Sequence, residues 1–264
     1  MDGCAAIARE YGLPFLATTP TRRANRERVA ASRFGEGILA DNAAFLRDVQ
    51  RRAGGEMYVG ALLGSRGDAY TGKDAPCREE SRAFHLWEAE RFARAGVDFL
   101  YAALMPAAPE AEGMALALQE TNLPHIISFT IGADGCLADG TPIAEAIERI
   151  DNLTGGAPLC YMTNCVHPDI AFQALAQPFN RRESVHTRFL GIQANTSPLP
   201  YAELDNAEDL HTSDPEALAR AMLKLRALAP LKIFGGCCGT DGRHLRTVAR
   251  RIGGSRKGCA SVEK

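Results

Sequence analysis

The sequence has no long hydrophobic run and no excess of basic residues, and these absences exclude whole classes of protein. None of its apolar stretches approaches the roughly 20 residues that a membrane-spanning helix needs. The N-terminal stretch MDGCAAIAREYG lacks the basic region and the apolar core of a signal peptide. The formal net charge is -2, so there is no electrostatic case for binding nucleic acid or an anionic membrane surface. We therefore expect a cytoplasmic protein that binds neither nucleic acid nor a membrane.

Nothing in the sequence marks an internal domain boundary, because it contains no charge run, low-complexity tract or proline-rich linker. Its 264 residues, of which 46% are hydrophobic, are enough to form one large domain with a full core. We predict a single domain over residues 1–252, followed by a flexible tail over residues 253–264.

Eight cysteines are present, and two of them, Cys237 and Cys238, are adjacent within the glycine-rich stretch FGGCCGT. In a chain of this length without a secretory signal, reduced thiols or metal ligands are expected rather than a disulfide framework. Neighbouring Cα atoms lie about 3.8 Å apart, closer than the roughly 4.4–6.8 Å that an ordinary disulfide prefers. We interpret the pair as two metal ligands, with a redox-active dithiol as the alternative.

Apolar stretches typical of strands alternate with stretches typical of amphipathic helices. The predicted strands are nearly continuous in apolar residues, as expected for strands that are buried on both faces. They cover residues 14–18, 56–64, 98–105, 125–131, 157–163, 188–194 and 231–236. Helices are predicted over residues 81–96, 141–151 and 213–230. The alternation predicts an α/β fold with a parallel sheet.

The number of predicted strands bears on the architecture. A closed barrel of eight strand–helix units, the (β/α)8 or TIM-type barrel, typically has about 250 residues, and the sequence supplies seven clear strands. A doubly wound open sheet is the competing architecture. No G-x-G-x-x-G fingerprint follows any predicted strand, which weakens the dinucleotide-binding version of that alternative. The count indicates a barrel with one strand unaccounted for.

A third cysteine, Cys165, also lies at a predicted strand end, within TNCVHPD. The C-terminal ends of the strands carry the active site in an α/β barrel. Three thiolates around one Zn²⁺ leave the fourth tetrahedral position open for a substrate. The metal also keeps a bound thiol in its nucleophilic thiolate form. Such a site suits the attack of a thiol on an alkyl group, although Cys165 taken alone is equally well explained as a small buried hydrophobe.

These stretches resemble the homocysteine S-methyltransferase family. The similarity is carried by YMTNCVHPD and FGGCCGTDGRHL, continues through ISFTIGADGCLADGTPIAEAI, and covers essentially the whole chain. One cysteine followed much later by Gly-Gly-Cys-Cys-Gly is a highly specific combination. The resemblance implies a (β/α)8 barrel with one Zn²⁺ bound at its mouth. The implied ligands, which are also the catalytic residues, are Cys165, Cys237 and Cys238.

The same resemblance implies the reaction and its partners. In the family, zinc-bound homocysteine attacks a methyl group on a sulfonium, ammonium or folate donor and gives methionine, which is a step of methionine biosynthesis. The expected partners are therefore a small-molecule thiol and a small methyl donor. Asn164 lies beside the first ligand, and Gly235 and Gly236 shape the turn that carries the other two, so all three are expected at the substrate site. Association into a homo-oligomer is left open.

Two features depart from the family pattern. The family opens with a strand that carries an Asp-Gly-Gly type of motif, whereas MDGC here runs directly into a helical pattern, AAIAREYG. We therefore expect a (β/α)8 barrel without the family's first strand, and the two exposed sheet edges of such a barrel favour association with another segment or chain.

Many members also have a glutamate that recognises the amino-acid ammonium group where this chain has Ala103. Another thiol is therefore open as the acceptor.

The sequence leaves two functions open. The first is a zinc-dependent thiol S-methyltransferase, with homocysteine as the leading acceptor and a methyl donor that the sequence does not specify. The second is a zinc-binding or redox-sensing barrel without transferase activity, in which Cys237 and Cys238 would oxidise reversibly.

Overall fold

The structure is a computed structural model that describes residues 1–199, 203 and 211–253. The tail predicted over residues 253–264 lies outside the described residues, apart from Gly253. Gly253 is the last residue of helix α11 (Gly242–Gly253). No helix among the described residues is long and apolar enough to cross a membrane.

Seven parallel strands form one sheet in which each strand pairs with its neighbour in the sequence. This arrangement confirms the predicted α/β fold with a parallel sheet. The strands are β1 (Phe15–Thr18), β2 (Met57–Gly64), β3 (Phe99–Met105), β4 (His125–Phe129), β5 (Cys160–Val166), β6 (Phe189–Ala194) and β7 (Ile233–Gly236).

Strand β5 lies three residues later in the chain than the strand predicted over residues 157–163. The strand begins at Cys160 rather than at residue 157, and it continues to Val166. The guanidinium group of Arg188 donates hydrogen bonds to the carbonyl groups of Gly156 and Pro158, so this apolar stretch is tied to a side chain before the strand starts. As a result Cys165 lies within β5, not after it.

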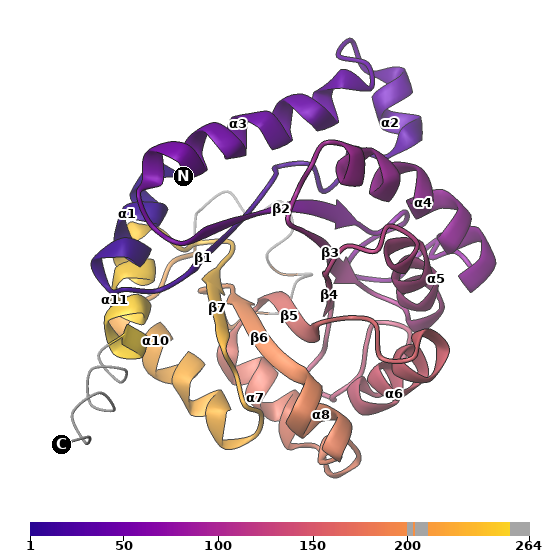
Figure 1. The fold of residues 1–264 in the computed structure, drawn as a ribbon. Helices are drawn as coiled ribbons and strands as arrows, with labels where there is room; N and C mark the ends of the chain where they lie inside the picture. The colour runs from indigo at the N-terminus through magenta and orange to yellow at the C-terminus, as the bar shows by residue number, and fades with distance from the viewer. Residues whose placement is uncertain (200–202, 204–210, 254–264) are drawn as a thin grey trace, which may run out of the picture.

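Helices surround the sheet on its outer side (Figure 1). The three predicted helices are confirmed as α4, α6 and α10, the last of which continues into a short 3-10 helix. The α-helices of the described chain are α1 (Asp2–Glu10), α2 (Arg26–Ala31), α3 (Gly37–Ala53), α4 (Arg78–Arg94), α5 (Ala108–Gln119), α6 (Ile143–Thr154), α7 (Pro168–Ala176), α8 (Glu183–Arg188), α10 (Pro215–Lys224) and α11. The 3-10 helices are η1 (Pro178–Asn180) and η2 (Leu225–Ala227).

The sheet is curled, and each of its faces has its own apolar cluster. The outer face packs against the helices in the main core, to which β2 contributes Val59 and Leu63. The inner face holds a second cluster that includes Phe99, Tyr101 and Met162. Burial on both faces explains why the strands appear in the sequence as nearly continuous apolar stretches.

The curled sheet is a half-barrel whose two edges are β1 and β7. Within the described residues these two strands are not paired with each other. Outside this gap, helix α1 packs against both α11 and α3, so the outer ring of helices continues past it (Figure 1). On the inner face near the β1 edge, the side chains of Leu16 and Tyr58 remain 37% and 42% exposed. The architecture is that of a TIM-like barrel with one strand missing.

Candidate three-cysteine site

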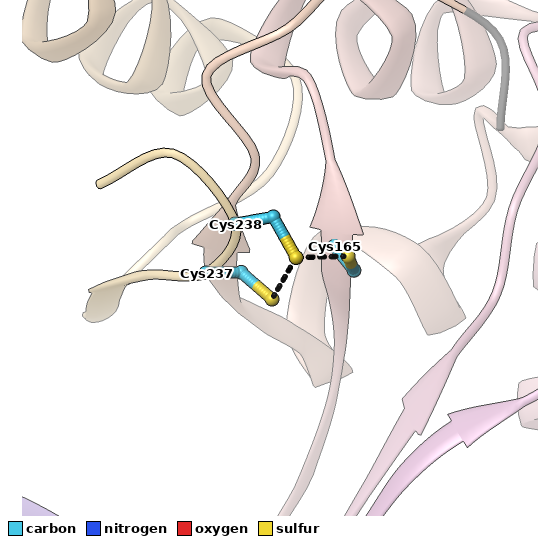
Figure 2. Close-up of side chains that lie close together, drawn as sticks. All are labelled: Cys165, Cys237 and Cys238. Carbon is cyan, nitrogen blue, oxygen red and sulfur yellow. Dashed lines mark hydrogen bonds between the residues drawn. The ribbon is translucent and has the colours of Figure 1, made fainter. Parts of the chain in front are cut away.

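Three cysteine sulfur atoms meet at the C-terminal end of the sheet (Figure 2). Cys165 comes from β5, while Cys237 and Cys238 come from the turn after β7. The Sγ atoms of Cys165 and Cys238 are 3.6 Å apart, and those of Cys237 and Cys238 are 4.0 Å apart. All three lie within 4.8 Å of one another. Among the described residues this is the one cluster of three or more potential metal-ligating side chains.

The backbone of Cys165 is left-handed, with a φ of 59°. This region is sparsely populated by residues other than glycine and costs about 1 kcal/mol or more. The pairing of β5 with β6 shifts register between Asn164 and Val166 at the same place. Neighbouring side chains of a regular strand point to opposite faces, yet Asn164 and Cys165 line the same cavity. The irregularity therefore presents both side chains at the mouth of the half-barrel.

Gly235 and Gly236 are the last two residues of strand β7 and lie directly before the turn. A Cβ atom at Gly236 would collide with the hydroxyl of Thr240, so the turn can close against this position only when it is a glycine. Both glycines have the backbone of an ordinary strand residue, without a positive φ. A Cβ atom at Gly235 would lie 3.0 Å from the side chain of Gln193, which makes this a close approach. The pairing with β6 extends one residue further, because the N–H of Cys237 donates to the carbonyl of Ala194 at 2.8 Å. Cys237 is thus held directly by the sheet.

The turn itself is built by Thr240 and Gly239. The N–H and the hydroxyl of Thr240 both donate to the carbonyl of Cys237, at 3.2 and 2.6 Å. Gly239 has a φ of 78°, and a Cβ atom there would collide with the hydroxyl of Thr196. Gly239 is therefore the glycine that the turn requires for its left-handed backbone. In the sequence, a glycine directly after the two adjacent cysteines is the feature that indicates this turn.

The three thiols influence one another's ionisation. Hydrogen bonding from Cys237 and Cys238 holds the pKa of Cys165 well below the ordinary value of a thiol. The same contact with Cys165 raises the pKa of Cys237 and of Cys238. Like charges this close disfavour one another. All three sulfur atoms are therefore thiolates together only when a cation compensates their charge.

A cavity of about 480 Å³ opens beside Cys165. Its walls include Tyr70, Asn164, His167 and Asn195, and the segment 130–140 that follows β4. None of the described residues that line it is a lysine or an arginine, and its one carboxylate is that of Asp134. A small molecule that is neutral or carries positive charge suits such walls better than an anion does.

The side chain of Asn164 is fixed by two donors. Its Oδ1 atom accepts a hydrogen bond from the hydroxyl of Ser128 at 2.6 Å and another from the N–H of Leu104 at 3.1 Å. Both donors bind the oxygen, so the orientation of the amide group is fixed and its nitrogen is left to donate elsewhere. Asn164 is buried but still forms part of the cavity wall.

The two histidines near the cysteine motifs differ in their position. His167 lines the cavity and caps helix α7, where its Nδ1 atom accepts from the N–H of Asp169. His244 is buried away from the cavity, and its ring nitrogens contact Asp241 and the carbonyl of Ser213, each at 2.9 Å. His244 is therefore a structural residue of α11, while His167 faces the site.

Tyr70 is a residue of the site that the sequence analysis missed. Its hydroxyl lies 3.4 Å from the Sγ atom of Cys165, although it belongs to the segment that follows β2. Segments that follow barrel strands assemble the active site, and this rule could have pointed to Tyr70.

The seven cysteines that the structure describes are free thiols, as expected from the absence of a disulfide framework.

Comparisons with known proteins identify the family through a family model and the fold through solved structures. A family model described as homocysteine S-methyltransferase matches residues 15–252. The fold is similar to crystal structures of the homocysteine methyltransferase MmuM from Escherichia coli. The metallated form is 20% identical, with 95% of this chain and 83% of that chain covered and a TM-score of 0.71. For the oxidized form the same shares are covered at 20% identity, with a TM-score of 0.72. No curated protein sequence matches the chain significantly.

Proposed function

The chain belongs to the homocysteine S-methyltransferase family, and we propose that it is a zinc-dependent enzyme that methylates a metal-bound thiolate. Homocysteine is the proposed acceptor, a small methyl donor supplies the methyl group, and methionine is the product. The observation that carries this proposal is the cluster of three sulfur atoms from Cys165, Cys237 and Cys238.

The spacing of the sulfur atoms fits a zinc ion. With Zn–S bonds of about 2.3 Å in tetrahedral geometry, two ligand sulfurs are about 3.8 Å apart. The observed separations of 3.6 and 4.0 Å lie on either side of this value. A divalent cation would also compensate the charge of three thiolates, which cannot be ionised together without one. Three protein ligands leave a position for the acceptor thiol, as in catalytic rather than structural zinc sites.

Zinc bound here would keep the acceptor thiol ionised at neutral pH, where a free thiol is mostly protonated. The protein's own residues would position the two substrates. The amide nitrogen of Asn164 is suited to donate to an acceptor carboxylate, because its oxygen is already engaged by Ser128 and Leu104. Gly235 and Gly236 would act indirectly, because they allow Gln193 and Thr240 to pack closely around the turn that carries two of the cysteines. The donor would occupy the cavity beside Cys165.

The identity of the acceptor depends on Ala103. This residue is buried at the C-terminal end of β3, where many family members have a glutamate. A carboxylate–ammonium contact is charge-assisted and hard to replace. A thiol without an α-amino group is therefore the competing acceptor, and the two are distinguished by their relative rates of methylation.

We also propose that the seven strands correspond to strands two to eight of a (β/α)8 barrel. Helix α1 packs between α11 and α3, which is where the helix that follows the first strand of such a barrel lies. The unpaired edges of β1 and β7 then mark the place of the first strand.

The alternative function is a zinc-binding or redox-sensing barrel without transferase activity. It is favoured by the open edge between β1 and β7, since a half-barrel leaves part of its inner face accessible to water. This alternative requires either metal binding without a methylated product or reversible oxidation of Cys237 and Cys238.

The test is the zinc content of reduced, anaerobically purified protein. The wild type is compared with Cys165→Ala and with Cys160→Ala, a matched control whose thiol is buried on the inner face outside the cluster. We expect about one zinc per chain in the wild type and the control, and little in Cys165→Ala. Wild-type protein without zinc contradicts the proposal. Zinc-loaded protein that methylates no thiol with any sulfonium, ammonium or folate donor supports the alternative.

A further inference from the structure

The loop between β2 and α4, residues 65–77, folds tightly on itself. The Oδ1 atom of Asp68 accepts hydrogen bonds from the N–H groups of Tyr70 at 2.9 Å and of Thr71 at 2.8 Å. The N–H of Asp68 donates to the carbonyl of Lys73 at 2.9 Å. This aspartate turn fixes the backbone on which Tyr70 stands.

Two further hydrogen bonds attach the loop to its neighbours. The N–H of Arg66 donates to the carboxylate of Glu110, a fully buried residue of α5, at 2.6 Å. The hydroxyl of Thr130, just after β4, donates to the carbonyl of Ala69 at 2.6 Å. The residue directly before Tyr70 is therefore held by the end of β4. This support restricts the positions that the Tyr70 side chain can take.

The supported side chain reaches the first cysteine of the site. The hydroxyl of Tyr70 lies 3.4 Å from the Sγ atom of Cys165. A tyrosine hydroxyl has an ordinary pKa of about 10 and carries its proton at neutral pH, whereas a metal-bound thiolate has no proton to donate. When Cys165 binds a metal, Tyr70 must therefore be the donor of this hydrogen bond.

We propose that Tyr70 is a positioning residue of the metal site, which orients the Cys165 thiolate and withdraws charge from its sulfur. The inference rests on the proposed zinc function. It makes the ligands unequal, because the Sγ atom of Cys165 lies 3.4 Å from a tyrosine hydroxyl. The Sγ atom of Cys238, by contrast, contacts the sulfur atoms of Cys165 and Cys237. A thiolate that accepts a hydrogen bond is a weaker nucleophile. Tyr70 would therefore direct methylation to the acceptor sulfur rather than to Cys165.

Zinc affinity and the spectrum of the cobalt-substituted protein test this role independently of turnover. The variant is Tyr70→Phe, which removes the hydroxyl and keeps the ring. The matched control is Tyr58→Phe, whose hydroxyl donates to Glu56. Tyr58 lies at the N-terminal end of β2, whereas the cysteines lie at the C-terminal ends of β5 and β7. Zinc affinity is measured by competition with a chromophoric chelator. We expect about 10-fold weaker zinc binding in Tyr70→Phe, because the Cys165 side chain loses the contact that orients it and stabilises its thiolate form. Binding in Tyr58→Phe should be unchanged.

In the Co²⁺-loaded protein, the thiolate-to-metal charge-transfer band of Tyr70→Phe is expected at lower energy, because the sulfur has lost a hydrogen bond. Identical affinity and spectra in Tyr70→Phe and the wild type overturn the inference while leaving the zinc function intact. Wild-type protein that binds neither Zn²⁺ nor Co²⁺ overturns both.

A second variant, Thr130→Val, removes one support of the loop and keeps Tyr70. It is expected to weaken zinc binding in the same direction by a smaller factor.

Discussion

The side chain of Asn164 joins the end of β5 to the end of β3, because its Oδ1 atom accepts a hydrogen bond from the N–H of Leu104 at 3.1 Å. Leu104 has a φ of 57°, and Cys165, next to Asn164, has a φ of 59°. Two left-handed residues at the mouth of the half-barrel are thus connected through one amide group. The hydroxyl of Ser128 at β4 donates to the same oxygen, so three strands share this contact.

Replacing Asn164 by alanine should destabilise the protein. The variant leaves the buried N–H of Leu104 and the hydroxyl of Ser128 without their acceptor, which costs about 1–3 kcal/mol. Ser128→Ala removes a donor together with its need for a partner and should cost less, about 1 kcal/mol. Urea unfolding of both variants measures the difference. Equal losses in the two variants would show that the amide oxygen has no special role.

Glu88 should make the stability of the protein fall as the pH rises. Burial raises the pKa of this carboxyl group well above its usual value, and its Oε1 atom has no hydrogen-bond partner in the described chain. The folded state then holds a proton that the unfolded state releases above about pH 4.3. Stability is therefore lost as the pH rises from that value toward the folded pKa.

The variant Glu88→Gln tests this by removing the charge at nearly constant size. Its gain in unfolding free energy over the wild type should be larger at pH 8 than at pH 5, and about 1 kcal/mol or more at pH 8. Glu90→Gln, on the exposed side of the same helix and paired with Arg94, is the control and should change stability by less than about 0.5 kcal/mol. A gain that is the same at both pH values would rule out a raised pKa at Glu88.

Removing the metal should lower the thermal stability of the wild type. A ligand present at 100 times its Kd stabilises the folded state by about 2.7 kcal/mol, which corresponds to roughly 5–10 °C in Tm for a chain of this size. A strong chelator should abolish this increment, and added zinc should restore it. Cys165→Ala should melt at the same temperature with and without chelator. A chelator effect of equal size in that variant would place the stabilising metal elsewhere.

The edges of the sheet should make the protein associate. β1 and β7 are the unpaired edges in the described chain, and the apolar side chains of Leu16 and Tyr58 are exposed on the inner face beside β1. Edges of this kind favour pairing with another chain unless a charge blocks them. We expect concentration-dependent association in sedimentation velocity and weaker association in Leu16→Lys. A wild-type chain that remains monomeric at high concentration contradicts this expectation.

Most of the fold could be predicted because its strands are buried on both faces. A stretch such as DFLYAALM needs apolar side chains at nearly every position, and this pattern is independent of which strands become neighbours. The start of β5 could not be predicted in this way, because Arg188, a residue some 30 positions later, engages the carbonyl groups of Gly156 and Pro158. The apolar character of residues 157–163 gives no information about that contact with Arg188.

The sequence by itself determined the chemistry that is available: three cysteines at two strand ends, a glycine that permits the turn after Cys238, and the family motif around them. Only the tertiary structure decided that Cys165 has a left-handed backbone within β5 and that its sulfur meets Cys238 at 3.6 Å. It also decided that Tyr70 contacts Cys165 from the loop after β2. The physical reason is that these contacts join residues far apart in the chain, and the curl and the register of the sheet set their distances.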